Sequence, residues 1–357
     1  MTMRERILAV VLGRELDRVP FVTYDNLGAP NEEVWAEIGR GNMGILRWTT
    51  LHSLVHPNCR FLTEDLAGDG ARVSRRTLCT PAGELTEHRG FEPAFGSAHI
   101  HEHFVKTPED YRILTSYLRD ITVVPDLTRY EQNRRELGED GLSLVATLRS
   151  PYQQLWVQWV SLQDLALHLY DCPELVEECV REMERIQTRV FEIVARSPAQ
   201  LVDVPDNVTA PAIGVKYFEK YCVPAYNELA GMLAERKLRP VPVFVHMDGE
   251  LKSLAGSIAA SKVGGLDSFT PVPDSETTAA QALEMWPGMK LLLNFPSSVH
   301  LQSPEEIYEA AMQILEQAGA SGQLQIQISE NVPHGVWRTS YPEIVRAIED
   351  FGRPGGR

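Results

Sequence analysis

The strongest constraint on the fold is a regular alternation of apolar runs and helical patterns that begins after residue 198. The alternation predicts strands near residues 200–204, 241–247, 265–270, 289–294 and 324–329. The intervening helices are expected to begin near residues 216, 250, 275, 303 and 341. Such a pattern is typical of parallel strands joined by right-handed crossovers. Three earlier apolar runs, at 19–24, 43–48 and 142–148, bring the predicted strands to eight.

Eight strand–helix units favour a closed (β/α)8 barrel over a doubly wound open sheet. An open sheet of the nucleotide-binding kind carries a glycine-rich phosphate loop after its first strand, and none follows residues 19–24. A length of 357 residues allows one barrel or two ordinary domains. We therefore predict an α/β fold, a (β/α)8 TIM barrel, as a single domain over residues 1–357.

One segment departs from the barrel pattern and reads as a β-hairpin excursion. Two runs of alternating polarity in residues 73–90 flank the turn sequence Thr80-Pro81-Ala82-Gly83, which is a hairpin signal. We expect an excursion over about residues 73–105 that decorates the barrel.

Capping signals set several helix ends. Thr2 with Glu5 and Ser303 with Glu306 have the spacing of capping boxes. Ser340 with Glu343 has the same spacing and predicts a further helix start.

Composition narrows the class of partner. The formal net charge is −15, and Lys and Arg form no stripe along the chain, so binding to nucleic acid is disfavoured. No apolar stretch is long enough to span a bilayer. The apolar run at residues 7–12 is too short for a signal peptide. We expect a cytoplasmic protein with no membrane contact.

The five cysteines include no CxxC pair and indicate no disulfide framework.

Polar residues follow most of the predicted strands where each apolar run ends. In a TIM barrel the reaction centre lies at the C-terminal ends of the strands, and polar groups there are costly unless they bind a ligand or one another. The residues at these positions are Asp25, Asn26, Arg149, Asp203, Asp206, Asn207, His246, Asp248, Asn294, Glu330, Asn331 and His334.

His246 and Asp248 form the sharpest local motif. Because side chains alternate along a strand, both point to the same face. They are positioned to bind a metal ion or a substrate group, with Glu330 as a third ligand. The alternative is a hydrogen-bonded barrel histidine that Asp248 orients. Asp206 and Asn207 either read the edge of a flat heterocycle or cap the following helix.

Several segments resemble the uroporphyrinogen decarboxylase superfamily. They are Arg4–Leu8, Gly13–Glu15, Asp17–Pro20, Thr80–Glu87, Val105–Tyr111 and Asp206–Pro211, with Tyr217, Phe218 and Pro224. Their order and spacing extend the resemblance over essentially the whole chain. The resemblance implies a TIM barrel, in agreement with the strand pattern, and a homodimer as one possible assembly.

That superfamily has two branches, and the residues of this chain at two places resemble one branch more than the other. True decarboxylases carry an arginine-rich R-Q-A-G-R segment after the first strand, where this chain has residues 23–30 with Asp25. The other branch comprises corrinoid-dependent methyltransferases. Its thiol-methylating members hold zinc on a His-x-Cys pair and a distant cysteine. His246 matches the histidine, while Asp248 and Glu330 stand near the places of the cysteines, and no cysteine follows Cys222.

The resemblance therefore implies a corrinoid-dependent methyltransferase, an enzyme of the EC 2.1.1 type. It would move a methyl group between a cobalamin carried by a partner protein and a small molecule such as tetrahydrofolate or a thiol. His246, Asp248 and Glu330 are the expected catalytic residues, with zinc bound to them or no metal at all. The expected substrate-binding residues are Asp25, Asn26, Arg149, Asp206, Asn207, Asn294, Asn331 and His334. The alternatives are a decarboxylase or lyase acting on another substrate, and a non-catalytic tetrapyrrole-binding protein.

Overall fold

The computed structural model of the chain describes residues 1–66, 73–92, 97–236 and 241–353. Contacts between residues divide the chain into two compact units. The first unit comprises Met1–Leu51, Leu127–Thr147 and Val194–Arg357, and the second comprises His52–Asp126 and Leu148–Ile193. A single domain over residues 1–357 stays a prediction.

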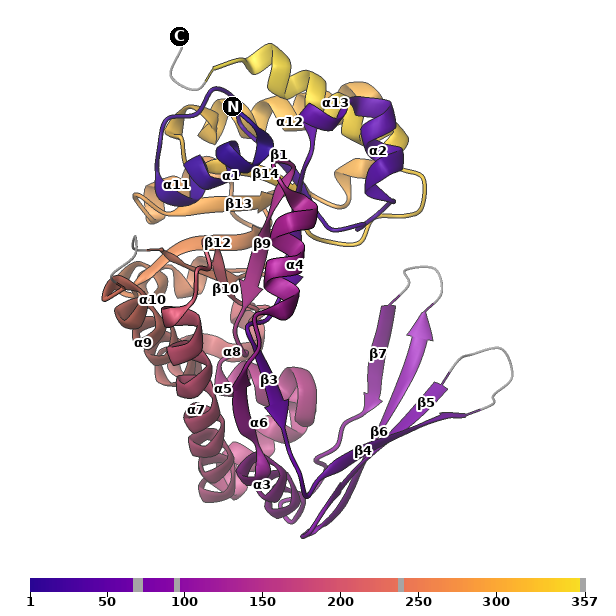
Figure 1. The fold of residues 1–357 in the computed structure, drawn as a ribbon, viewed down its shortest axis with the longest axis vertical. Coiled ribbons are helices and arrows are strands. Elements are labelled where there is room, and N and C mark those ends of the chain that lie inside the picture. The colour runs from indigo at the N-terminus through magenta and orange to yellow at the C-terminus, as the bar shows by residue number, and fades with distance from the viewer. Residues whose placement is uncertain (67–72, 93–96, 237–240, 354–357) are drawn as a thin grey trace. The chain divides into compact units, whose positions relative to one another are not determined.

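The first unit is built on a closed barrel of parallel strands (Figure 1). The order around the ring is β1-β14-β13-β12-β11-β10-β9-β2, and β2 pairs with β1 again. The strands are β1 (Phe21–Tyr24), β2 (Gly44–Thr49), β9 (Gly141–Ala146), β10 (Val202–Val204), β11 (Val243–His246), β12 (Val263–Phe269), β13 (Lys290–Asn294) and β14 (Leu324–Ile328). The predicted TIM barrel is confirmed, and each barrel strand overlaps a predicted one.

Ring closure depends on the first strand. β1 pairs with β14 through Phe21 and Ile326, and with β2 through Val22 and Gly44. Every strand of the ring therefore has two neighbours, and the C-terminal ends of strands far apart in the sequence meet at one mouth.

The first unit also contains helices that connect most of these strands, while the chain passes through the second unit between β2 and β9 and between β9 and β10. The helices are α1 (Met3–Leu12), α2 (Asn31–Ile38), α4 (Thr128–Leu137), α8 (Ala210–Tyr217), α9 (Val223–Ala234), α10 (Ala255–Ala260), α11 (Ala279–Met285), α12 (Pro304–Ala318) and α13 (Trp337–Phe351). The capping boxes at Thr2 and Ser303 are confirmed.

The predicted start of the last helix at Ser340 is wrong. Helix α13 begins at Trp337, because Trp337 and Tyr341 are four residues apart and both are buried. Packing of that face extends the helix upstream of Ser340. The Ser340 hydroxyl contacts Nδ1 of His300 instead, at 2.8 Å.

Helix α1 covers the N-terminal end of the barrel. Ile7, Val10 and Val11 on its buried face share one apolar cluster with strand residues. The strand residues in that cluster include Val22, Leu46, Leu142, Leu144, Phe244 and Leu292. Because the interior of the barrel at this end is filled with apolar side chains, a reaction centre inside the barrel is expected toward the opposite end, where the strands terminate.

The second unit carries two small antiparallel sheets. One pairs β3 (His52–Val55) with β8 (Thr122–Pro125). The other has the order β4-β5-β6-β7 (Figure 1). Its strands are β4 (Arg60–Leu66), β5 (Val73–Thr80), β6 (Gly83–Glu92) and β7 (Ser97–Glu102). The predicted hairpin is confirmed, since β5 and β6 pair as far as Thr80 and Gly83.

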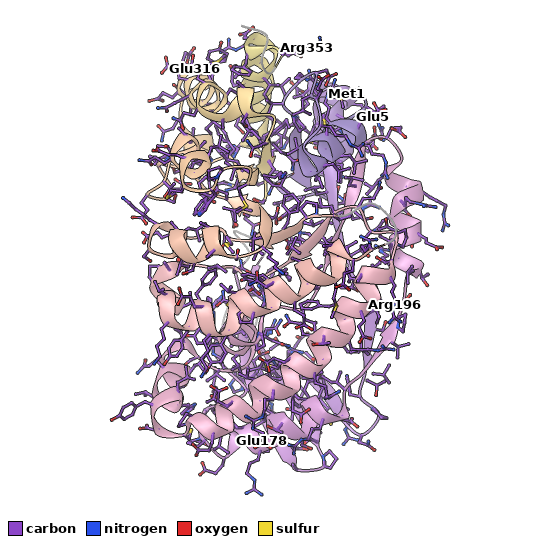
Figure 2. All side chains as sticks on the ribbon, turned by 90° about the vertical axis from the view of Figure 1, so that its left-hand side faces the viewer. Met1, Glu5, Glu178, Arg196, Glu316 and Arg353 are labelled. Atoms are coloured by element: carbon purple, nitrogen blue, oxygen red, sulfur yellow. The ribbon has the colours of Figure 1, made fainter. Side chains whose placement is uncertain are left out.

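Four helices accompany these sheets in the chain. They are α3 (Asp110–Asp120), α5 (Pro151–Gln154), α6 (Leu162–Asp171) and α7 (Pro173–Arg196). Figure 2 labels Glu178 and Arg196 on the long helix α7. Across the described parts of the chain, no helix is both long and apolar enough to cross a membrane. All five cysteines are free thiols.

Candidate active site

His246, Asp248 and Glu330 lie together at the C-terminal ends of the barrel strands. His246 is the last residue of β11, and Asp248 follows it by two positions. Glu330 follows the end of β14. One ligand atom from each side chain lies within 4.8 Å of the others. The structure therefore brings together three residues that the sequence places on two non-adjacent strands.

The imidazole of His246 is held by two groups inside the barrel. Its Nδ1 lies 2.8 Å from Oδ2 of Asp267 and 3.2 Å from the hydroxyl of Tyr24. The Tyr24 hydroxyl itself donates to Asp267 Oδ2 at 2.5 Å. Since the carboxylate oxygen accepts both bonds, Nδ1 carries a proton. The Nε2 atom is then directed toward the cluster, 3.7 Å from Asp248 Oδ2.

Asp267 is in turn fixed by a row of buried glutamines. Gln327 donates from Nε2 to Asp267 Oδ1 at 2.9 Å, and Gln325 donates to Gln327 Oε1 at 2.9 Å. All three side chains are fully buried. A buried carboxylate with hydrogen bonds at both oxygens has a defined orientation, so His246 is held on a rigid support.

Charges within the cluster shift one another's protonation. Burial disfavours a charged imidazole, but the interactions with Asp248 and Asp267 outweigh it and raise the pKa of His246 well above its usual range. Burial alone would raise the pKa of Asp248, yet contacts with His246 and Asn207 lower it. Burial and the nearby charge of Asp248 raise the pKa of Glu330. The carboxyl group of Glu330 therefore holds a proton more readily than that of a solvent-exposed glutamate.

Strained backbone surrounds this centre. Among the described residues, the non-glycine residues with positive φ are Asn26, Asn207 and Ser268. Asn207 and Ser268 both contact the cluster. Asn207 donates from Nδ2 to Asp248 Oδ2 at 2.8 Å, and the Ser268 hydroxyl lies 3.4 Å from Glu330 Oε1. Such backbone angles carry a cost that is typical of functional sites.

Asn294 sits beside the cluster with part of its amide unused. Its Oδ1 accepts from the backbone and hydroxyl of Ser329, at 3.0 and 3.1 Å. Its Nδ2 is buried and has no hydrogen-bond partner among the described residues. An unmet buried donor costs about 1–3 kcal/mol, and a bound acceptor atom would satisfy it.

Two aromatic rings flank His246. The Trp48 ring centroid lies 6.2 Å from that of His246 and 5.4 Å from that of Tyr24. Trp48 is only partly buried. Its ring therefore keeps some accessible surface next to the cluster, and an aromatic ring can stack against a planar ligand.

Asp25 and Asn26 make their contacts elsewhere. The Asp25 carboxylate binds Nε of Arg47 at 2.6 Å and Nδ2 of Asn31 at 2.7 Å. Asn26 exchanges backbone–side-chain bonds with Asn31. Both residues line a separate cavity of about 260 Å³. Side chains alternate along a strand, so Tyr24 reaches His246 and its neighbour Asp25 does not.

The remaining predicted substrate-binding residues are spread out. Asp206 is buried and accepts a 2.5 Å bond from the Tyr226 hydroxyl. Asn331 and His334 are exposed between β14 and α13. Arg149 belongs to the second unit, where its carbonyl accepts a bond from Gln187. Their roles in binding substrate stay predictions.

Several residues that hold His246 in place were not predicted from the sequence. Asp267 and Gln327 lie inside β12 and β14, so a survey of strand ends passes over them, while Tyr24 ends β1 and was passed over in favour of Asp25 and Asn26. The signal available in the sequence was Asp267 itself, an acidic residue inside the strand predicted at residues 265–270. A buried charge in a strand needs a partner.

The donor set fits a divalent cation. One imidazole nitrogen and two carboxylates with an open position resemble the ligand count of a catalytic zinc centre. The Asp267 bond to Nδ1 also leaves Nε2 of His246 for coordination, as metal-binding histidines require. A set with two oxygen donors suits zinc or a harder ion better than a thiolate-preferring one.

Comparisons with known proteins identify similar structures and the family of this chain. A methyltransferase from Methanosarcina mazei has a similar structure, with a TM-score of 0.58 at 12% identity, over 98% of this chain and 99% of that chain. A B12-independent methionine synthase from Shewanella sp. W3-18-1 matches with a TM-score of 0.44 at 10% identity, over 64% and 68%. No curated protein matches the sequence. The family model for uroporphyrinogen decarboxylase (URO-D) matches residues 96–351, most of the chain. The protein therefore belongs to the uroporphyrinogen decarboxylase family.

Proposed function

We propose that this protein is a methyltransferase that moves a methyl group between a corrinoid on a partner protein and a small molecule such as tetrahydrofolate or a thiol. The observation that carries the proposal is the convergence of His246, Asp248 and Glu330 at the mouth of the barrel. The segment after β1 supports it too. That segment lacks the arginines that a polycarboxylated porphyrinogen needs, and Asp25 stands there instead.

Methyl transfer to an N–H or S–H group releases one proton. Glu330 is the side chain suited to take it, because its pKa is raised and it lies within the cluster. His246 and Asp248 hold the acceptor against Glu330 by hydrogen bonds or through a bound cation. When bound, a divalent cation supplies Lewis acidity that lowers the pKa of an acceptor thiol.

Alignment of the two reactants is the other contribution to the rate of methyl transfer. Displacement at a methyl carbon is sensitive to geometry, so a rigid pocket supplies much of the acceleration. The unpartnered Nδ2 of Asn294 donates to the small molecule, Asn207 keeps Asp248 in place, and the Trp48 ring stacks against a planar face. We assign Asp206 to positioning, since Tyr226 already occupies one of its carboxylate oxygens.

A cobalamin assay tests the proposal directly. The protein is mixed with methylcob(III)alamin and with tetrahydrofolate or a thiol, and the cobalamin absorption spectrum is followed. We expect acceptor-dependent loss of the methylated spectrum with the wild-type protein and none with His246→Ala. His99→Ala removes an exposed histidine of β7 and serves as the matched control.

Other outcomes of that assay identify the alternatives. Release of carbon dioxide from a carboxylated substrate, with an unchanged cobalamin spectrum, would establish a lyase. Tight corrinoid binding without turnover, equal in the wild type and in His246→Ala, would establish a non-catalytic binding protein. Either result would refute methyl transfer.

A further inference from the structure

A second cavity lies in the first unit, at the opposite end of the barrel from His246. Its volume is about 490 Å³, within the range of small-molecule sites. It is bordered by α1, by α4, by the segment that leads into β10 and by residues on either side of the connection to β11. The lining residues are Arg4, Leu8, Leu12, Arg14, Tyr130, Arg134, Pro198, Ala199, Gln200, Arg236 and Val241.

The lining of this cavity is strongly cationic. Among the described lining residues there are four arginines, Arg4, Arg14, Arg134 and Arg236, and none is Asp or Glu. None of the four forms an ion pair with a described carboxylate, whereas other arginines of this unit, such as Arg6, do. A cluster of uncompensated positive charge is unexpected in a chain with a net charge of −15.

Two of the guanidinium groups are fixed in place. Arg4 donates to the carbonyl of Gly141 and to Oε1 of Gln200, at 3.3 and 2.5 Å. Arg236 donates to the carbonyls of Ala199 and Ser197. A guanidinium has five N–H donors, so each of these groups keeps donors for a ligand.

The other two arginines are exposed. The structure records no hydrogen bond or ion pair for the side chain of Arg14 or Arg134 within the part of the chain that it describes, and both residues are solvent-accessible. The cavity thus combines two anchored guanidinium groups with two that are unengaged.

Three of the four positive charges act on Tyr130. Burial raises the pKa of Tyr130, while the charges of Arg134, Arg4 and Arg236 act to lower it. Like charges gathered in a partly enclosed space repel one another. An anion placed among them removes that repulsion, and guanidinium groups bind phosphate and carboxylate through paired hydrogen bonds.

We propose that this cavity binds a small polyanion, a phosphorylated or polycarboxylated molecule whose apolar part packs against Leu8 and Leu12. The four guanidinium groups contact its anionic groups. The site is separate from the cluster around His246 and does not depend on methyl transfer. Because α1, α4 and the segment before β10 all border the cavity, a bound polyanion ties together elements at the base of the barrel.

Calorimetric titration and thermal melting test this site. The probes are pyrophosphate for phosphate ligands and citrate for carboxylate ligands, each at fixed ionic strength. We expect saturable binding of at least one probe, with a rise in melting temperature. Binding should weaken at least tenfold in the double variant Arg14→Gln/Arg134→Gln, whose exposed side chains are not needed for folding. The probe that binds more tightly identifies the ligand class.

A double variant of equal charge provides the control. Arg338→Gln/Arg346→Gln removes two exposed arginines of α13 that pair with Glu33 and Glu343. We expect this control, and His246→Ala, to bind the probe as the wild type does. Equal weakening in both double variants would show only non-specific attraction and would overturn the proposal. So would the lack of saturable binding of either probe.

Discussion

The imidazole Nδ1 of His246 and the carboxylate Oδ2 of Asp267 are 2.8 Å apart, and this contact decides which ring nitrogen faces the barrel mouth. Asp267 lies on β12, the neighbour of β11 in the ring, and the two residues are paired in register. The orientation of the reactive histidine is therefore built into the barrel wall itself. Substitutions in the wall should act on the site without touching a ligand.

Asp267→Asn should lower the metal affinity or the activity of the site, although Asp267 acts only through its contact with His246. The neutral amide accepts a weaker hydrogen bond from Nδ1 of His246 than the carboxylate does. The proton is then no longer fixed on Nδ1, and Nε2 is no longer kept unprotonated for the cluster. Loss of such a supporting carboxylate lowers metal affinity or activity about 10–100-fold. Chelator competition and the cobalamin assay measure both quantities. Asp350→Asn changes an exposed carboxylate bonded to Tyr308 and is the control. Equal behaviour of the two variants would contradict the role of Asp267.

The His246, Asp248 and Glu330 cluster should retain a divalent cation. We expect the protein, after loading with zinc and removal of the excess, to keep roughly one ion per chain, as a three-ligand centre does. The double variant His246→Ala/Asp248→Asn should keep none. Elemental analysis of the purified proteins gives the answer. If the wild type also loses all its zinc, the cluster works by hydrogen bonding and proton transfer alone.

His300 should make the fold sensitive to acid. Burial lowers the pKa of His300 to about 4, although the charge of Asp274 acts in the opposite direction. The unfolded chain binds this proton more readily than the folded one, because an unperturbed histidine has a pKa of about 6.5. Stability is therefore lost as the pH falls from about 6.5 to about 4, by about 3 kcal/mol for this group.

The variant His300→Gln isolates that contribution. It carries no titrating ring, so its free energy of unfolding should depend less on pH over the same interval. Urea denaturation of both proteins at a series of pH values measures the difference. Identical pH profiles would remove His300 as a source of acid sensitivity.

Gly265 should be intolerant of any side chain. A Cβ at this position would lie 2.1 Å from Cε1 of the Phe244 ring, which is fully buried on the neighbouring strand. Gly265→Ala should therefore destabilise the fold by about 1–3 kcal/mol, the usual cost of overpacking. Urea denaturation measures this effect.

Two further variants define its cause. In a Phe244→Leu background the cost of Gly265→Ala should shrink, since the ring that meets the new methyl group is gone. Gly256→Ala, at an exposed position of helix α10, meets nothing within 4 Å and should be neutral or slightly stabilising. If Gly265→Ala keeps its full cost in the Phe244→Leu background, the clash is not with the ring.

The barrel could be predicted because its periodic signals are local. Apolar runs bounded by turns and capping boxes repeat along the second half of the chain, and the ring follows from their number. The start of α13 was misplaced because the capping-box spacing at Ser340 was outweighed by burial of Trp337 and Tyr341. That burial depends on tertiary packing, which spacing alone does not report.

The site could be predicted only in part, for a related reason. His246, Asp248 and Glu330 lie at or just after strand ends, and any closed barrel brings such positions together. Asp25 was expected among them, but the alternation of the strand directs it to Arg47 instead. Asp267 and Gln327 escaped notice because their function depends on which strands are neighbours in the ring, which becomes definite only with the register.

The pairing of Phe21 with Ile326 also determines when the protein can become complete during its synthesis. One side of β1 finds β2 early, yet its other side has no hydrogen-bonding partner until β14 has left the ribosome. Until β14 has been made, the nascent chain presents an unprotected strand edge, which is a site for intermolecular pairing. Loss of the C-terminal segment would leave that edge permanently open, so truncated chains should aggregate.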